Sequence, residues 1–307
     1  MRLAKGQKLS ARYKSIERQS YLLIALPLIG FFTFTLYPIV WSIIKSFYFY
    51  DQVPSHTVFT GLQNFKNLFA DGAYWKTWVA TFKFMIYKLP FEVFLTLILA
   101  VLLGKKLKGS GFFRGFYYMP CVISVAIVGL IFSNFFDYFG FLNHQMVRFG
   151  IIKEPIDWFA TEGTAFFVLC IGSIWSHFGT NVLYFSAAIT NVPDDLYEAA
   201  EIDGAGSIRK FWSITIPMIA PVFRTILLLA INGTLHVGEY IVVLTNGAPA
   251  GSTHTVGSYM ITQFLPGFVT GAPNIGYGCA MALVNSIIYG LVAVIYRKLS
   301  DKMKTVY

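Results

Sequence analysis

Long apolar stretches alternate with short polar segments along the whole chain. A stretch of about 20 apolar residues spans a bilayer as an α-helix, because lipid offers no hydrogen-bond partners to an exposed backbone. Six stretches reach this length, at residues 21–44, 78–103, 112–136, 165–189, 218–244 and 277–296. The pattern therefore predicts an all-α, polytopic membrane protein with six transmembrane helices.

Basic residues in the segments between these stretches indicate the orientation in the membrane. Segments 1–19, 104–114, 191–217 and 297–307 contain six, four, two and four Lys and Arg residues, whereas segment 246–275 contains no charged residue. With six helices, the four basic segments lie on one side, which the positive-inside rule identifies as the cytoplasm. Both termini are therefore predicted to be cytoplasmic.

This topology divides the chain into a membrane domain and two tails. The predicted parts are a basic cytoplasmic tail (1–19), a six-helix transmembrane domain (20–299) with a cytoplasmic loop (191–217), and a second cytoplasmic tail (300–307). On the outer side, we expect the amphipathic segment 51–75 to cap the membrane domain. We also expect a short interfacial or re-entrant helix at residues 259–265.

The composition of the 307 residues agrees with a membrane protein. Apolar residues make up 56 % and charged residues 13 %, whereas soluble domains contain roughly 25 % charged residues. Such a composition disfavours a soluble enzyme, a disordered chain and a disulfide scaffold. The net charge of +9 comes mainly from segments between the apolar stretches, so we attribute it to topology and expect no nucleic-acid partner. The cysteines Cys121, Cys170 and Cys279 have no metal-ligand spacing, so no metal site or disulfide is expected.

The cytoplasmic loop at residues 191–217 is the most polar loop of the chain. Pro193 suits the first turn of a helix, and Gly204 and Gly206 can end that helix in a left-handed conformation. A second short helix is expected at residues 207–213. Two short helices at a sharp turn would form a compact knob on the cytoplasmic surface.

This loop also contains a spaced motif. Glu198-Ala199-Ala200 is followed after three residues by Gly204 and after nine more by Ile214-x-Ile216-Pro217. The spacing resembles the EAA loop of ABC importer permeases, with Ile216 in place of the usual Leu. The resemblance implies that the loop docks into a cleft of a cytosolic ATPase and transmits its closure. The implied coupling residues are Glu198, Ala199, Ala200, Asp203, Gly204 and Pro217. The alternative is an ordinary amphipathic intracellular helix.

Other segments are similar to the carbohydrate branch of these permeases. They are residues 36–39, 46–47, 61–65, 113–120, 140–143 and 244–249. The resemblance implies a multi-pass protein in a bacterial or archaeal cell membrane, surrounded by lipid. Its implied partners are a second related permease (a heterodimer), a cytosolic ABC ATPase dimer that binds ATP and Mg, and an extracytoplasmic solute-binding protein. The implied cargo is a sugar, most simply an oligosaccharide.

Polar residues recur at helical spacing in the fourth apolar stretch. Ser173, Ser176, His177, Thr180 and Tyr184 share one face of the expected helix. Polar faces inside a membrane contact protein or a water-filled path, and packing between helices is an equally plain alternative.

The fifth apolar stretch has a face of small residues. Ala230, Gly233, Thr234 and Val237 recur there at the same helical spacing. The resemblance implies that the sugar-contacting face lies on the two spans that flank the cytoplasmic loop. We therefore predict a substrate pathway along both faces, and helix packing remains the alternative.

Several ionisable residues lie inside the apolar stretches and need partners or access to water. Lys88 and Glu92 are four residues apart and are expected to form a structural ion pair, while Lys83 is expected to reach the outer interface. Glu239 is expected to be an exposed or paired carboxylate.

The sequence contains no P-loop and no catalytic constellation. We therefore expect a transport subunit that is not an enzyme and has no cofactor of its own. Two alternatives remain: another solute, such as a glycerol-phosphate ester, or a different class, an intramembrane enzyme or passive channel.

Overall fold

The structure is a computed structural model that describes residues 11–104, 110–264 and 273–302. These residues are nearly all helical, which confirms the predicted fold class. The helices are α1 (Ala11–Phe31), α2 (Tyr37–Lys45), α3 (Gln63–Ala70), α4 (Gly72–Gly104), α5 (Ser110–Tyr118), α6 (Val125–Phe135), α7 (Phe141–Arg148), α8 (Glu162–Thr190), α9 (Asp194–Ile202), α10 (Ser207–Lys210), α11 (Ile216–Leu235), α12 (Glu239–Leu244), α13 (Val256–Phe264) and α14 (Ile275–Lys302). The strands β1 (Tyr48–Phe49) and β2 (Val58–Phe59) form an antiparallel pair.

Five helical runs in the described residues are long and apolar enough to cross a membrane. They are Ile16–Lys45, Gly72–Leu103, Glu162–Thr190, Ser207–Leu235 and Ile275–Asp301. A bent pair of helices, Gly111–Val122 and Val125–Phe135, would make a sixth span. The number agrees with the six predicted stretches, whereas the cytoplasmic placement of the termini and the domain boundaries stay predictions.

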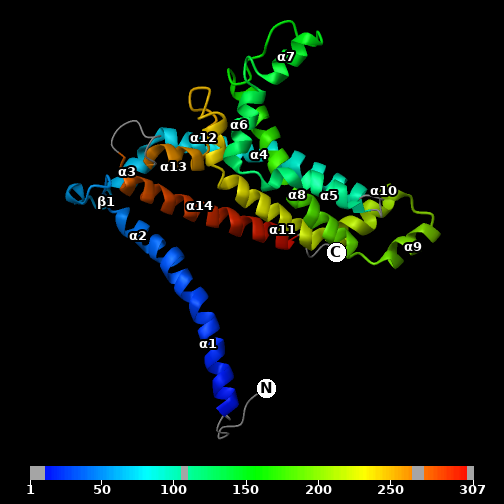
Figure 1. Ribbon diagram of the computed structural model, residues 1–307, viewed down its shortest axis with the longest axis horizontal. Helices are drawn as coiled ribbons and strands as arrows, with labels where there is room; N and C mark the ends of the chain where they lie inside the picture. Colours follow the sequence, from blue (N-terminus) through cyan, green and yellow to red (C-terminus); the bar gives the residue numbers. More distant parts are fainter. Residues whose placement is uncertain (1–10, 105–109, 265–272, 303–307) are drawn as a thin grey trace.

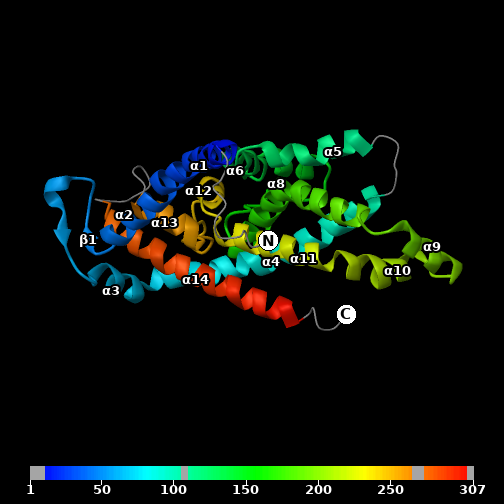
Figure 2. The same cartoon turned by 90° about the horizontal axis from the view of Figure 1, so that it is seen from below.

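The long helices form an elongated bundle. Helices α4, α11 and α14 pack side by side, with α9 and α10 at one end and β1 and α3 at the other (Figure 2). Helix α8 packs along α4, and α6 with α7 projects from one side of the bundle (Figure 1).

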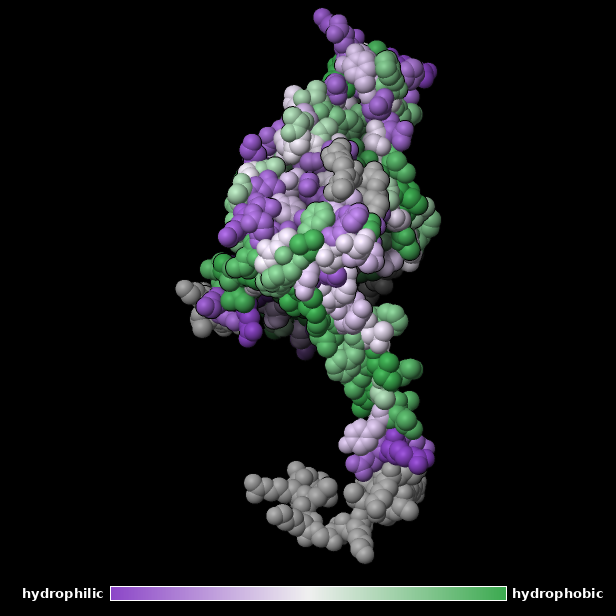
Figure 3. All heavy atoms as spheres, turned by 90° about the vertical axis from the view of Figure 1, so that its left-hand side faces the viewer, coloured by the Kyte–Doolittle hydropathy of each residue, from purple (hydrophilic) through white to green (hydrophobic). Residues whose placement is uncertain are grey.

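The first helical run stands apart from this bundle. Helix α2 packs against α14, but α1 leads away from the body of the molecule (Figure 1). The apolar stretch of this run is not buried by the described residues. Its surface is largely hydrophobic (Figure 3), with Leu23 and Phe34 exposing 76 % and 81 % of their area. These side chains suit contact with lipid or with another apolar helix.

The predicted helix at residues 112–136 is wrong as a single helix. Helix α5 is followed by a short 3₁₀ turn (Met119–Val122), and α6 then leaves at an angle of 93°. Pro120 lies in this turn, and proline cannot donate the backbone hydrogen bond that would continue the helix.

The predicted helix at residues 218–244 is also interrupted. Helix α11 ends at Leu235, and α12 begins at Glu239. The Thr255 hydroxyl donates a hydrogen bond of 2.7 Å to the carbonyl oxygen of Val237, which lies in the break. A Cβ on Gly238 would lie 2.9 Å from the carbonyl carbon of Gly257. The chain therefore turns where two backbone segments approach too closely for side chains.

The segments at the α3 end of the bundle lie where the sequence predicts a cap. Asp71 precedes α4 and accepts hydrogen bonds of 2.8 Å from the hydroxyls of Tyr259 and Tyr277. Burial opposes ionisation of Asp71, but these hydrogen bonds lower its pKa below the ordinary value for aspartate. The segment 259–265 is predicted to be helical, and α13 contains its residues 259–264. Residue 265 lies outside the described residues. Asp71 thus ties α4 to α13 and α14.

Candidate functional site

The cytoplasmic loop of the prediction forms a two-helix projection at one end of the bundle (Figure 1). Helix α9 follows Pro193 and ends at Ile202, and Gly204, two residues later, has a φ of +74°. The amide of Ala205 donates to the carbonyl oxygen of Ala200 at 2.8 Å and so caps the last turn. This left-handed position explains why a glycine follows the motif at a fixed distance.

The second half of the loop differs from the prediction. The expected separate helix at residues 207–213 continues without interruption through a π-helical turn (Phe211–Thr215) into α11. Pro217 is the second residue of α11, directly after the π-helical turn, and as a proline it donates no backbone hydrogen bond to the preceding turn. Helix α10 is therefore the end of a membrane-spanning helical run, so a movement of α9 and α10 acts directly on that run.

The predicted coupling residues lie mainly on the surface of this projection. Glu198, Ala199, Asp203 and Gly204 are exposed, while Ala200 and Pro217 are half-buried. Tyr197 points the other way and shares a 2.8 Å hydrogen bond with the Thr215 hydroxyl. Large apolar side chains are exposed beside the motif: Ile202 by 88 %, Ile208 by 78 % and Trp212 by 64 %. An apolar, carboxylate-bearing surface of this kind suits docking to a protein partner.

A second candidate site is a polar cavity between the helices. We call it the polar pocket, and it has a volume of about 240 Å³. Its lining residues are Lys88 from α4, Val125 from α6, Ser173, Ser176 and His177 from α8, Gly233 from α11, His236, Val237 and Gly238 from the break, and Glu239 and Tyr240 from α12. The break between α11 and α12 thus forms one wall of the polar pocket.

The structure brings five of the nine predicted pathway residues together at this pocket. They are Ser173, Ser176, His177, Gly233 and Val237. Thr234 lies buried behind the wall, where it donates a hydrogen bond of 2.8 Å to the carbonyl oxygen of Ala230. The half-buried Thr180 and the exposed Tyr184 lie further along α8 and do not line the pocket.

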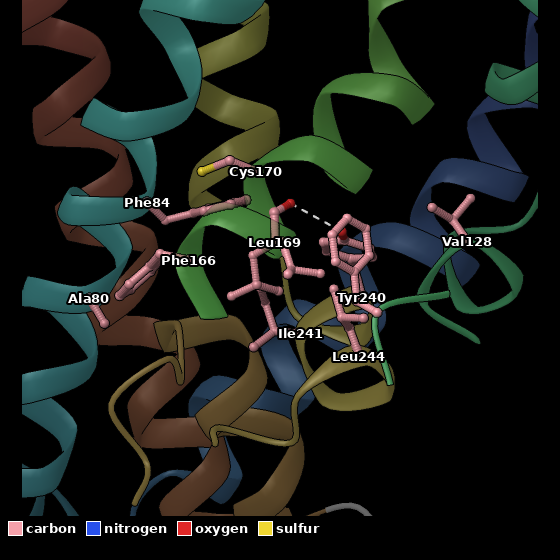
Figure 4. Close-up of a cluster of buried hydrophobic side chains, with 11 residues drawn as sticks. Ala80, Phe84, Val128, Phe166, Leu169, Cys170, Tyr240, Ile241 and Leu244 are labelled. Atoms are coloured by element: carbon pink, nitrogen blue, oxygen red, sulfur yellow. Dashed lines mark hydrogen bonds between the residues drawn. The ribbon is translucent and has the colours of Figure 1, made fainter. Parts of the chain in front are cut away.

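Six lining residues were not predicted as pathway residues. Lys88, His236 and Glu239 did carry a signal, because ionisable side chains are rare inside membrane spans. Val125, Gly238 and Tyr240 carried none, since they reach the pocket through the two helix breaks. Tyr240 is held there by a hydrogen bond of 3.1 Å from its hydroxyl to the carbonyl oxygen of Leu169 (Figure 4).

A buried ion pair lies at the floor of the polar pocket. Lys88 Nζ is 3.2 Å from Glu92 Oε2, and the two side chains expose 4 % and 2 % of their area. Asn181 donates a hydrogen bond of 2.9 Å to Glu92 Oε1, and Lys88 donates one of 3.3 Å to the Thr234 hydroxyl. The predicted structural pairing is confirmed, and it joins α4, α8 and α11.

Lys83 also finds a partner rather than reaching the interface alone. Its ammonium group is 2.6 Å from Glu162 Oε1, and both side chains are 42 % exposed. Glu162 lies in the first turn of α8, where a carboxylate is favoured by the helix dipole. This pair gives a second link between α4 and α8, near the end of the bundle that contains α3.

Comparison with known proteins places these features in a family. A family model described as "Binding-protein-dependent transport system inner membrane component" matches residues 92–301. The arabinooligosaccharides transport system permease protein AraP of Bacillus subtilis is 33 % identical over 299 residues, which cover 95 % of this chain and 91 % of AraP. The lactose transport system permease protein LacF of Rhizobium radiobacter is 32 % identical over 263 residues, or 84 % of this chain and 87 % of LacF.

A solved structure has the same fold. The structure of a bacterial ABC transporter involved in the import of the acidic polysaccharide alginate matches with a TM-score of 0.79 at 21 % identity, over 94 % of this chain and 98 % of the other. The chain therefore belongs to the family of binding-protein-dependent transport system inner membrane components, and it is a multi-pass ABC importer permease.

Proposed function

We propose that this chain forms half of the transmembrane path of an importer that carries an oligosaccharide into the cell. The similarity to AraP and LacF over most of the chain carries this proposal. A second, related permease would complete the path, and an extracytoplasmic solute-binding protein would deliver the sugar. ATP and Mg would bind to two copies of a cytosolic ATPase, and this chain would contribute no covalent chemistry.

The projection formed by α9 and α10 is the proposed contact with the ATPase. The side chain of the exposed Glu198 has no hydrogen bond or ion pair with any other described residue, so its carboxylate is available to a partner. Closure of the ATPase pair would draw the projections of the two permeases together. Because α10 continues into α11, this movement would tilt α11 and change access to the polar pocket. Substrate and nucleotide would each bias two states through their different affinities for them.

The polar pocket and the predicted faces of α8 and α11 are the proposed sugar path. The nine predicted residues are Ser173, Ser176, His177, Thr180, Tyr184, Ala230, Gly233, Thr234 and Val237. Hydroxyl and imidazole groups supply hydrogen bonds to a sugar, and the small residues leave room for it. The internal pairing of Lys88 with Glu92 gives no support to the alternative of a glycerol-phosphate ester.

One experiment tests the coupling role. Glu198→Lys is compared with Glu17→Lys, which changes another exposed carboxylate on the predicted cytoplasmic side. Both are measured in proteoliposomes that contain the complete complex, by oligosaccharide uptake and by saccharide-stimulated ATPase activity. We expect Glu198→Lys to lower both rates at least tenfold, which is about 1.4 kcal/mol, and Glu17→Lys to leave them unchanged. Equal rates in the two variants would contradict the docking role.

The cargo is tested by uptake across a panel of oligosaccharides in the same proteoliposomes. We expect ATP-dependent accumulation of at least one neutral chain together with its binding protein. A complex that accumulates no saccharide would contradict the proposed cargo, whether or not the ATPase docks.

A further inference from the structure

We infer that the polar pocket selects uncharged, hydroxyl-rich saccharides and that Glu239 is the residue that rejects acidic ones. This inference rests on the proposed function and deepens it, since it concerns which oligosaccharides pass. It follows from the hydrogen-bonding groups and charges around the pocket rather than from its size.

Several hydrogen-bond donors around the pocket are used within the protein. Lys88 donates to Thr234 and forms an ion pair with Glu92, and the Ser176 hydroxyl donates to the carbonyl oxygen of Ser173 at 3.0 Å. The Tyr240 hydroxyl donates to the carbonyl oxygen of Leu169. Among the described lining side chains, the Ser173 hydroxyl and a third N–H of Lys88 keep a donor for a ligand.

Acceptors also line the pocket. His177 Nδ1 lies 2.9 Å from the carbonyl oxygen of Ser173, and His236 Nδ1 lies 2.8 Å from that of Asn232. A carbonyl oxygen only accepts, so a neutral His236 ring has its hydrogen on Nδ1 and presents Nε2 as an acceptor. His177 Nδ1 also lies 2.8 Å from the Ser176 hydroxyl, so Nε2 of His177 can serve a ligand as donor or acceptor. Glu239 adds a carboxylate that is exposed to the pocket. Sugar hydroxyls can donate to these groups, whereas a ligand carboxylate or sulfate brings acceptors only.

The charges around the pocket favour the same class of ligand. Lys88 is the one cation among the described lining residues, and its charge is balanced by Glu92 at 3.2 Å. Glu239 has no ion pair with any described residue. One negative charge therefore remains uncompensated on this wall. At about 4 Å, two like charges near a protein surface repel by several kcal/mol before screening, so a ligand carboxylate beside Glu239 is disfavoured.

The test uses the complete complex in proteoliposomes and a pair of saccharides of equal length. One is neutral, and the other has a terminal hydroxymethyl group oxidised to a carboxylate. The pair is chosen so that the solute-binding protein binds both saccharides. The measured quantity is the ratio of acidic to neutral uptake in each variant. All variants share the same binding protein and partner subunits, so any preference of these proteins for one saccharide cancels in the comparison.

Glu239→Gln keeps the size and one acceptor oxygen but removes the charge. We expect it to raise the ratio of acidic to neutral uptake about tenfold over the unmodified complex. Glu154→Gln removes an exposed carboxylate outside the pocket and should change the ratio less than twofold. A change of less than twofold in Glu239→Gln, with neutral uptake intact, would overturn the inference. A complex that imports no saccharide would instead contradict the proposed function.

A second measurement is independent of acidic substrates. In a Glu239→Cys variant, turnover of the neutral saccharide should slow modification by a charged methanethiosulfonate reagent at least threefold, because the sugar occupies the pocket. A Glu154→Cys variant should show no protection. Equal labelling of Glu239→Cys with and without saccharide would also overturn the inference.

Discussion

The ion pair between Lys88 and Glu92 gives the sharpest test of the packing described above. Both side chains are almost completely buried between α4, α8 and α11. The perturbation is a pair of single variants, Lys88→Met and Glu92→Gln, and the double variant that contains both. The glutamine retains an oxygen that can accept the hydrogen bond from Asn181, so the change in Glu92 is confined to its charge.

The expected magnitude follows from the burial. Each single variant leaves one buried charge without its partner, which costs about 3–5 kcal/mol. The double variant leaves no buried charge and replaces the pair by groups of similar volume, so we expect its free energy of unfolding to be within about 1 kcal/mol of the original. The two substitutions should therefore be coupled by about 5 kcal/mol or more, whereas independent sites are additive to within about 0.5 kcal/mol.

The assay is unfolding of the purified permease in mixed micelles with increasing dodecyl sulfate, followed by tryptophan fluorescence. Unfolding rates replace midpoints if the transition is irreversible. Two results would refute the reasoning: single variants that lose less than about 1 kcal/mol, or a double variant that loses the sum of the two single losses. Either would show that the pair is hydrated or already separated in the membrane.

Three further predictions follow from single positions. A Cβ on Gly179 would lie 2.3 Å from the carbonyl oxygen of Tyr117, so Gly179→Ala should destabilise the micelle-solubilised protein by about 1–3 kcal/mol; unchanged unfolding would refute this contact. Nothing lies within 4 Å of a Cβ on Gly233, so Gly233→Phe should fold normally but abolish uptake by filling the polar pocket, and normal uptake would remove Gly233 from the path. Asp71→Asn should lose about 1–3 kcal/mol at pH 7. Because folding lowers the pKa of Asp71, the original protein should lose the same stability as pH falls below about 4. Melting temperatures that fall equally with pH in the original protein and in Asp71→Asn would refute this prediction.

The positions of the long helices could be predicted because each depends on its own stretch of sequence. The predicted stretches 165–189 and 277–296 agree with α8 (Glu162–Thr190) and α14 (Ile275–Lys302) to within a few residues at most ends. Bilayer thickness and backbone hydrogen bonding alone determine such lengths. The loop at residues 191–217 could be located for a similar reason, since the left-handed Gly204 that follows α9 is a local feature.

The two helix breaks could not be predicted in the same way. Each apolar stretch continues through its break, so hydropathy alone shows no end. The break before α12 depends on Thr255, which donates to Val237 from 18 residues away, and on the close approach of Gly238 to Gly257. These contacts exist only in the folded chain. For the same reason periodicity placed Ser173 and His177 on one face, but could not show that Glu239 lines the same pocket.

The interruption at residues 236–238 has a mechanical consequence for the chain. Helix α12 packs against α6, whereas α11 is continuous with α10 through the π-helical turn. A few backbone dihedral angles between Leu235 and Glu239 can therefore act as a hinge. The α9 end of the bundle can change its inclination while the opposite wall of the cavity stays fixed to α6. A continuous helix over residues 216–244 would instead move both ends as one rigid rod.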